Sequence, residues 1–391
     1  MTAYTTTDGS KTVYSYFAET TPGTPLVGAY QTLRSKTGVK FDLKRDTFMS
    51  KERRADQMES SMSYGNKSGS GSIPVEHSYG AYDDLYEAAM GGTWDTNVLK
   101  MGTTDRSFTI EETATELGIT EQIVGAKCTG FSISQKVNGI AEGSFEFGVF
   151  RDVRGGQTKG VTVAIDASAK TITRASAGFN TVDGFPLVVA GVPALSVTTT
   201  GFSDAGNNVT SAVTTLTDTV ITLTTLASGT TASGVTTALI ANATIASSLV
   251  AATTLAPFDS FTGTIQEGGV AIGHVTGWDL KMEQAVQPNF ACGSDSPVST
   301  STGVKKVSGN LTVLYIDQAL RKKFLNGTAT SLKLILGSVA AEEAYTFDLG
   351  TVKFTSNTRD DSEMARIESM AFAATYTATD TTLKITRTPA T

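Results

Sequence analysis

Cysteine and histidine are almost missing from this chain of 391 residues, which contains two of each. Cys128 and Cys292 lie far apart and in no spacing that metal ligands adopt, so the sequence excludes a disulfide framework. We therefore expect both thiols to be reduced, as in a protein that is assembled inside a cell.

Long apolar runs are missing as well. The stretch at 186–195 is one of the longest, and it is far too short to span a bilayer. The N-terminal sequence MTAYTTTDGSK lacks the basic and then apolar pattern of a signal peptide. We expect a soluble protein that is made in the cytoplasm and is not exported through an N-terminal signal.

Recognisable catalytic motifs are absent from the sequence. His77 and His274 lie in no metal or nucleophile motif, and neither a phosphate-binding glycine loop nor a nucleophile elbow occurs. The acidic run at 360–363 fails the spacing of a calcium loop and more simply indicates a hairpin tip. The sequence thus predicts no enzyme, no cofactor and no metal site.

Charged residues make up only 18% of the chain, and the formal net charge is −7. An acidic chain is a poor candidate for gripping nucleic acid by neutralising its phosphates, although nucleic acid can still slide past its surface. Apolar residues reach 40%, which indicates a globular protein. The 38 glycines, with abundant Thr, Ser and Val, favour β structure with many turns.

The two parts of the chain that flank its middle contain related stretches. GSIPVEHSYGAYDDLYEAAMGGTW and GNLTVLYIDQALRKKFLNGT each suggest a strand, a short helix, a glycine stop and a threonine. Phe41 in the first part aligns with Trp278 in the second. Because the matches keep the same order, we infer a duplication, with chance similarity of short β segments as the alternative. The matching segments are 39–46 with 277–284, 71–94 with 309–328, and 139–149 with 366–376.

Period-two alternation of apolar and polar residues marks three strands, at 39–44, 143–149 and 278–283. Such alternation predicts that one face of each strand lies in a core and that the other is wet. The wet faces carry charges of both signs.

Two short helices are predicted, at 80–92 and 316–327, and each ends at a glycine that can adopt the left-handed conformation. Leu85 and Ala89 form the apolar stripe of the first helix. Asp317 is the expected N-cap of the second helix. The apolar stripe of this second helix is Ile316, Leu320 and Phe324.

The middle of the chain has a different composition, rich in Thr, Ala, Val, Ser and Gly with few charges. Its alternation of strand-like and turn-like segments indicates a small all-β domain rather than a linker, although the order of 226–256 stays open. We expect a first half at 1–158, the inserted domain at 159–261 and a second half at 262–391.

Residues 46–72 are polar, become glycine-rich and show no clear period. A stretch of this length without secondary structure is unusual inside a compact domain. We expect a long loop that orders against a neighbouring subunit, and the alternative is a solvated surface segment.

Several segments together resemble the major tail tube proteins of bacteriophages with long, non-contractile tails. The stretch at 71–94 is the most specific, and the resemblance covers about 1–150 and 262–391. The inserted segment resembles a small β domain that such tail proteins often carry. The other segments that carry the resemblance are ETTPGTP, SKERRADQ, RSFTIEE, TGFSISQKVNGIAEGSFEFGV and LKITR.

The resemblance implies a mainly β fold: a tail-tube-type β-sandwich or barrel of two similar halves, each with a short helix, plus the inserted small all-β domain. It implies hexameric rings that stack into the tube of a virion tail, assembled in the host cytoplasm, through which double-stranded DNA passes. The implied partners are other copies of the chain, the tape measure, tail terminator and distal tail proteins, and a host surface touched by the inserted domain. The alternative is a surface-displayed β-rich adhesin or binding module.

Two sets of side chains follow from these expectations. Carboxylates on the wet strand faces are candidates for the lumen of the tube, namely Asp42, Glu146, Asp279 and Glu283. Charged and aromatic residues near the long loop and the first helix are candidates for contacts between subunits, namely Arg45, Arg53, Arg54, Asp56, Tyr79 and Asp83.

Overall fold

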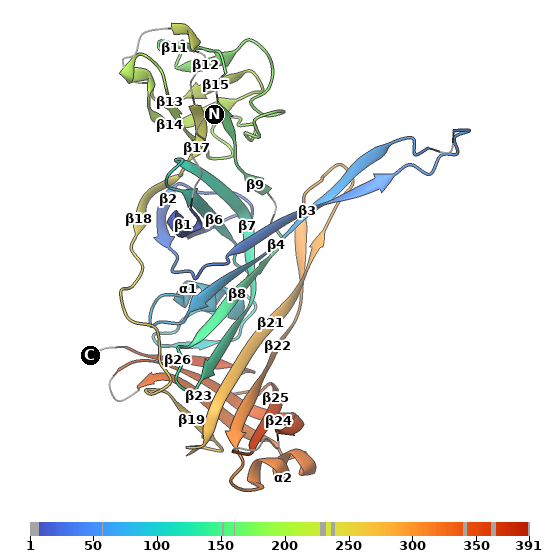
Figure 1. Cartoon of the computed structure of the whole chain (residues 1–391), viewed down its shortest axis with the longest axis vertical. Helices are drawn as coiled ribbons and strands as arrows, with labels where there is room; N and C mark the ends of the chain where they lie inside the picture. Colours follow the sequence, from blue (N-terminus) through green and yellow to red (C-terminus); the bar gives the residue numbers. More distant parts are fainter. Residues whose placement is uncertain are drawn as a thin grey trace. The chain divides into compact units, whose positions relative to one another are not determined.

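The computed structural model describes residues 8–56, 58–150, 152–159, 161–226, 232–235, 239–338, 342–360 and 365–389. These residues are mainly β and include two short α-helices, α1 (Asp83–Met90) and α2 (Ala319–Asn326) (Figure 1). Neither described helix has the length and apolar character that crossing a membrane requires. Asp361 to Glu363, expected at a hairpin tip, lie outside the described residues.

The chain forms two compact units. Unit 1 comprises Met1–Leu33, Ser107–Ala126 and Phe150–Ala252, and unit 2 comprises the other residues, Arg34–Arg106, Lys127–Val149 and Thr253–Thr391.

An eight-stranded sheet in unit 1 takes its strands from the middle of the chain. Its strand order is β10-β17-β13-β14-β15-β12-β11-β16. The core beneath it holds Phe179 and Phe185, whose ring centroids lie 6.3 Å apart, and the fully buried Ile221. The strands are β10 (Gln157–Lys159), β11 (Val163–Asp166), β12 (Thr171–Arg174), β13 (Ser196–Thr200), β14 (Thr210–Leu216), β15 (Val220–Leu223), β16 (Ala232–Val235) and β17 (Leu239–Ala243), with a 3-10 turn at Ala205–Asn207.

The remaining strands of unit 1 pair in the order β18-β2-β1-β6-β7-β9. β18 runs parallel to β2, so the chain leaves the eight-stranded sheet after Ala243 and joins this second sheet. Of the segment 226–256, residues 227–231 and 236–238 lie outside the described residues. The strands are β1 (Thr12–Ala18, after a 3-10 turn at Gly9–Lys11), β2 (Gly28–Thr32), β6 (Phe108–Ala114), β7 (Ile119–Lys136), β9 (Asp152–Arg154) and β18 (Ala246–Val250).

Unit 2 contains a long antiparallel sheet in the order β3-β4-β8-β7-β21-β22-β25-β24. The first part of β24 also pairs with β23 and β26, which continue to β19, β20 and β5. The strands are β3 (Lys40–Met49), β4 (Met62–Glu76), β5 (Val98–Lys100), β8 (Glu142–Gly148), β19 (Thr264–Glu267), β20 (Val270–Ala271), β21 (Val275–Asn289), β22 (Ser299–Leu314), β23 (Thr330–Ser338), β24 (Glu342–Asp360), β25 (Ile367–Ala374) and β26 (Lys384–Thr388).

The strand pairings occur twice along the chain, which supports the duplication inferred from sequence. In the first repeat β3 pairs with β4, β4 with β8 and β8 with β7; in the second, β21 pairs with β22, β22 with β25 and β25 with β24. The long strand of each repeat then enters a second sheet. β7 pairs there with β6 and β9, as β24 pairs with β23 and β26. Each repeat therefore contributes strands to two sheets, as the β-sandwich expected from the sequence requires, and contains one short helix.

Matching β-bulges fix which residues of the two repeats are equivalent. β3 is bulged between Arg45 and Thr47, and β21 between Gln284 and Val286. Counting from these bulges, Phe41 corresponds to Leu280. The sequence match of Phe41 with Trp278 is therefore wrong by two residues. A short apolar–Asp–Leu–Lys motif allows this error, because a shift of two residues keeps each side chain on the same face of the strand.

The core of unit 2 lies under one face of the long sheet and is covered by α1. Leu85 and Ala89 are buried, as predicted, and Gly91 ends the helix in the left-handed conformation. Tyr86 packs between Phe131 of β7 and Phe347 of β24, at centroid distances of 5.0 and 6.0 Å.

The second helix follows its prediction less closely. Gly327 ends it with φ of 64°, and the Asp317 carboxylate accepts the Ala319 N–H at 2.8 Å although Gln318 occupies the cap position. Leu320 is buried, whereas Ile316 precedes the helix and is 66% exposed. The expected apolar stripe is thus wrong at Ile316, because the helix starts later than its pattern suggested.

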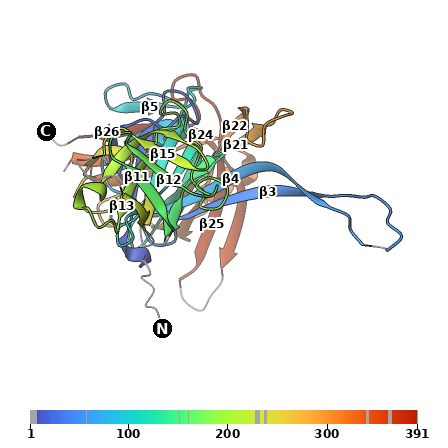
Figure 2. The ribbon, with the colours of Figure 1, turned by 90° about the horizontal axis from the view of Figure 1, so that it is seen from above.

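The hairpin of β3 and β4 corrects two expectations. Residues 46–72 were expected to lack secondary structure, but the ladder of β3 and β4 reaches Met49 and Met62 (Figure 2). Main-chain hydrogen bonds hold it, and its Ser and Gly residues show no period because much of the hairpin has no core to face. For the same reason Leu43, expected on a buried face, is 48% exposed.

The buried His77 joins three elements of the core. Its Nε2 donates to the Ser132 carbonyl at 3.0 Å, and its Nδ1 accepts the Tyr86 hydroxyl at 2.7 Å. Both partners suit the neutral ring, and burial lowers the pKa of His77 from 6.5 to about 4.

The unfolded chain binds a proton at His77 between pH 6.5 and about 4, whereas the folded chain does not. We expect stability to fall as pH falls through this window, by roughly 3 kcal/mol from this group. In His77→Gln the pH dependence should be shallower by that amount, as measured by urea unfolding across the window. An equally steep loss in the variant would contradict the assignment.

Candidate functional site

The four lumen candidates lie on one face of the long sheet in unit 2, opposite the core. Asp42 pairs with Ser70 on β4. Ser72, two residues further along β4 and on the same face, pairs with Glu146. Glu146 and Glu283 each pair with Gly130 of β7, from opposite sides. The structure therefore brings together carboxylates that are far apart in sequence. We define the outward side chains of β3, β4, β8, β7, β21 and β22 as the polar face.

Serine hydroxyls dominate the centre of the polar face. The Ser72 and Ser144 hydroxyls donate to the Glu146 carboxylate at 3.0 and 2.7 Å, and Ser144 also contacts the Ser132 hydroxyl at 3.0 Å. Short side chains leave the sheet smooth, and their hydroxyls satisfy the carboxylate without a basic partner.

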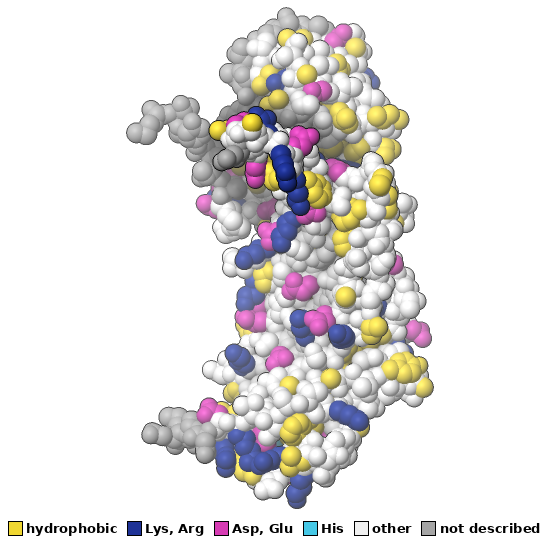
Figure 3. All heavy atoms as spheres, turned by 90° about the vertical axis from the view of Figure 1, so that its right-hand side faces the viewer, with side chains coloured by type: hydrophobic (Ala, Val, Ile, Leu, Met, Phe, Trp, Pro, Cys, Tyr) yellow, Lys and Arg dark blue, Asp and Glu magenta, His cyan; other side chains and the backbone are white. Residues whose placement is uncertain are grey.

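Charges on the polar face alternate in sign. Lys281 lies 2.7 Å from Glu283, and its hydrogen bond lowers the pKa of Glu283. Partial burial raises the pKa of Asp279. Lys40 and Lys44 flank Asp42 on β3. From one side of the molecule, basic and acidic side chains are interspersed among uncharged ones along most of the surface (Figure 3). Such a face offers duplex DNA no strong attraction.

The β3–β4 hairpin, which we call the arm, is anchored at its base. The Arg45 guanidinium lies 4.5 Å from the Tyr64 ring centroid and 3.8 Å from the Asp295 carboxylate. Lys67 contacts the same carboxylate at 2.7 Å, and this hydrogen bond lowers the pKa of Asp295. Of the contact candidates, Arg45 therefore contributes to the arm's own structure.

The arm tip, residues 50–61, carries three other contact candidates. Arg54 pairs with Asp56 at 2.8 Å, and this contact lowers the pKa of Asp56, while Arg53 is exposed. Sequence reasoning missed the apolar residues at and next to the tip. Their signal was present, since large apolar residues recur in an otherwise polar segment. They are Phe48, Met49, Met58, Met62 and Tyr64, between 49% and 69% exposed.

Tyr79 and Asp83 lie away from the arm, in a cluster within unit 2. The Tyr79 and Tyr345 rings are 5.2 Å apart, and the Tyr345 hydroxyl donates to Asp83. Arg387 donates to Asp83 at 2.6 Å and covers the Trp94 ring at 4.4 Å. These contacts hold α1 on β24 and β26 within one chain.

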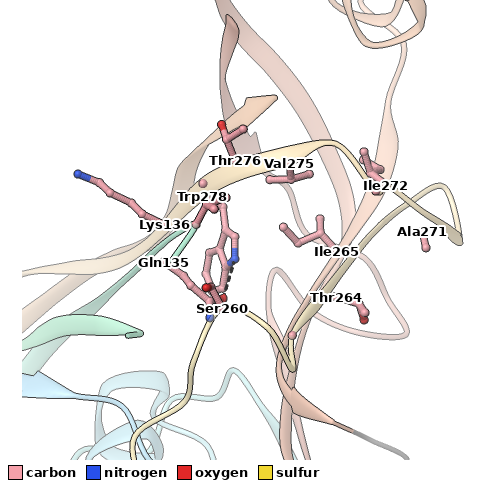
Figure 4. Close-up of a pocket in the computed structure, with 14 residues that line it drawn as sticks. Gln135, Lys136, Ser260, Thr264, Ile265, Ala271, Ile272, Val275, Thr276 and Trp278 are labelled. Atoms are coloured by element: carbon pink, nitrogen blue, oxygen red, sulfur yellow. Dashed lines mark hydrogen bonds between the residues drawn. The ribbon is translucent and has the colours of Figure 1, made fainter. Parts of the chain in front are cut away.

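A groove of about 290 Å³ lies where β19 and β20 pass the end of β21 (Figure 4). The Trp278 indole N–H donates to Gln135 Oε1 at 3.2 Å at its floor. Lys136 is the one ionisable side chain of its lining. Within the described ranges, moreover, acidic, histidine and cysteine side chains do not gather in threes as a metal site requires. The groove therefore has no arrangement suited to acid–base or metal chemistry.

Comparison with known proteins gives one informative result. A search of curated proteins found no match. A family model described as phage tail tube protein matches the chain twice, at residues 9–201 and 199–389. The first match contains β1 to β13 and the second contains β14 to β26, so each match includes one set of the duplicated strand pairings and part of the eight-stranded sheet. The resemblance inferred from sequence is confirmed at the level of the family: the chain belongs to the phage tail tube proteins, structural components of the virion tail, and contains two copies of their unit.

Proposed function

We propose that copies of this chain form stacked rings, that the rings build the tube of a long, non-contractile tail, and that genome DNA passes through it. The observation that carries this proposal is the polar face. Residues from both repeats form one continuous sheet with a core on one side and polar side chains, with charges of both signs, on the other. A sheet built in this way suits the wall of a water-filled bore, because its outward side chains neither aggregate nor bind DNA tightly.

The arm supports stacking between rings. A long hairpin with exposed apolar residues near its tip needs a partner surface, since such a hairpin is otherwise a site of aggregation. We propose that Phe48 and Met58 dock on the adjacent ring and that Arg53 and the Arg54–Asp56 pair contact its rim. Tyr79 and Asp83 act indirectly in this scheme, by fixing α1.

The inserted domain is proposed to lie outside the tube wall. We place it at 157–243, where the sequence suggested 159–261, because β10 begins at Gln157 and the residues after Ala243 pair with β2. It contacts host surfaces in this proposal. The ring ends contact the tape measure, tail terminator and distal tail proteins, and assembly takes place in the host cytoplasm.

Electron microscopy of the concentrated purified protein tests the proposal. We expect tubes of uniform width, with the polar face lining the bore, the arms against the adjacent ring and the inserted domains outside. An adhesin or binding module would remain as discrete particles, and that outcome would exclude a tail tube.

The arm contact can be tested with Phe48→Glu and Met58→Glu together. Both side chains are largely exposed, at 61% and 69%, so thermal stability of the single chain should stay unchanged. Buried charge at the ring contact should abolish long tubes. Lys51→Glu, also exposed on the tip, serves as the control and should polymerise. Normal tubes from the double variant would remove the arm from the stacking contact.

The bore can be tested by reversing charge on the polar face. In virions that carry Asp42→Lys and Glu283→Lys, we expect intact tails and several-fold slower genome release, because added lysines bind phosphates. The slowing should weaken as salt is raised. The matched neutral variant, Asp42→Asn with Glu283→Gln, should release DNA at nearly the normal rate. Unchanged release from the lysine variant would place these residues away from the bore.

A further inference from the structure

The two repeats of one chain are joined by a ladder between β7 and β21. Gln135 pairs with Trp278, Ile133 with Leu280 and Phe131 with Met282. Leu280 and Met282 are fully buried, because β7 covers one edge of β21 and β22 covers the other. We call this ladder the internal junction.

The equivalent edges of the two repeats lack such a partner in the described part of the chain. β3, the counterpart of β21, pairs only with β4. β24, the counterpart of β7, pairs from Lys353 to Asp360 only with β25. Leu43 occupies the place of Met282 but is 48% exposed, where Met282 is 0% exposed. A side chain that the internal junction buries is thus left open at the other end of the repeat pair.

The helices show the same difference. α1 packs against strands of the second repeat, through Tyr86 and Phe347, and five of its eight residues are buried. α2 has one buried residue, Leu320, while Leu325 is 65% exposed. α1 buries one face against the repeat that follows it. Among the described residues no further repeat covers the equivalent face of α2.

We propose that chains associate head to tail by pairing β24 of one copy with β3 of the next, which reproduces the internal junction between chains. This rests on the proposed ring assembly. The partner is a second copy of this chain, and α2 packs against the first repeat of that copy. A heterologous contact of this kind generates closed rings when its rotation closes.

The bulges predict the register of this contact. β7 is bulged between Cys128 and Gly130, and β24 between Phe354 and Ser356. If β24 takes the place of β7 and β3 takes the place of β21 in the internal junction, with the bulges aligned, Asp42 lies opposite Thr358 and Lys40 lies opposite Asp360. The second pair joins opposite charges on the same face, which favours this register over its neighbours.

One consequence concerns the number of chains in a ring. Each chain supplies two adjacent tail tube units, so the units in a ring are twice as numerous as the chains. A ring with the six units of a hexamer of single-unit subunits would contain three copies of this chain.

Cysteine cross-linking tests the register. Chains with Asp42→Cys are mixed with chains with Thr358→Cys, both carrying Cys292→Ser to remove the exposed native thiol, and are assembled and mildly oxidised. We expect a disulfide-linked dimer on a denaturing gel, since directly opposed strand residues bring their Cβ atoms within about 5 Å. Lys353→Cys replaces Thr358→Cys in the control and should give little dimer, because it lies about 17 Å further along the strand.

Charge reversal gives a second readout. Lys40→Glu should raise the concentration needed for polymerisation several-fold, since it opposes Asp360. Adding Asp360→Lys should restore assembly, whereas Lys353→Glu alone should have little effect. Restoration shows a pair across the contact, which a general effect on folding would not produce.

The outcomes separate this inference from the proposed function. If the unmodified protein forms neither rings nor tubes, the proposed function itself fails. If tubes form but Asp42→Cys and Thr358→Cys give no dimer, or the charge-reversed pair shows no recovery, the tail tube stands and the β3–β24 contact is wrong.

Discussion

Main-chain hydrogen bonding along strand edges is the constraint on which unit 2 depends. The ladder of β7 with β21 turns two four-stranded sheets into one surface, and it does so without requiring particular side chains. The polar face follows from this continuity, because alternation along each strand then places Glu146 and Glu283 on the same side. The cover of α1 on the opposite side follows as well, since one continuous sheet has one continuous core.

Much of this arrangement could be predicted from the sequence, because alternation is a local signal. The strands at 143–149 and 278–283, the glycine ends of both helices and the duplication all came from patterns a few residues long. To expect the lumen candidates on one face of the sheet, it was enough to assign the outward face of each strand correctly.

Features that depend on pairing between strands far apart in the sequence could not be predicted from local patterns. The exposure of Leu43 depends on which strand lies beside β3. The correspondence of Phe41 to Leu280, and not to Trp278, depends on the positions of the bulges. The arm was misread because Ser and Gly carry no period when neither face meets a core, although most of them pair in the ladder of β3 and β4. Tyr79 and Asp83 were candidates for contacts between subunits, and their partners within the chain, Tyr345 and Arg387, lie more than two hundred residues away.

The duplication also removes a restriction that identical subunits impose. In a ring of single units, any projecting element is present at every position and must avoid copies of itself on both sides. Here the eight-stranded sheet follows β9 of the first repeat, and its described strands have no counterpart after β26 of the second. In the proposed ring, a bulky domain would therefore occur at alternate positions only. Crowding around the proposed wall would be halved while the wall itself stays complete.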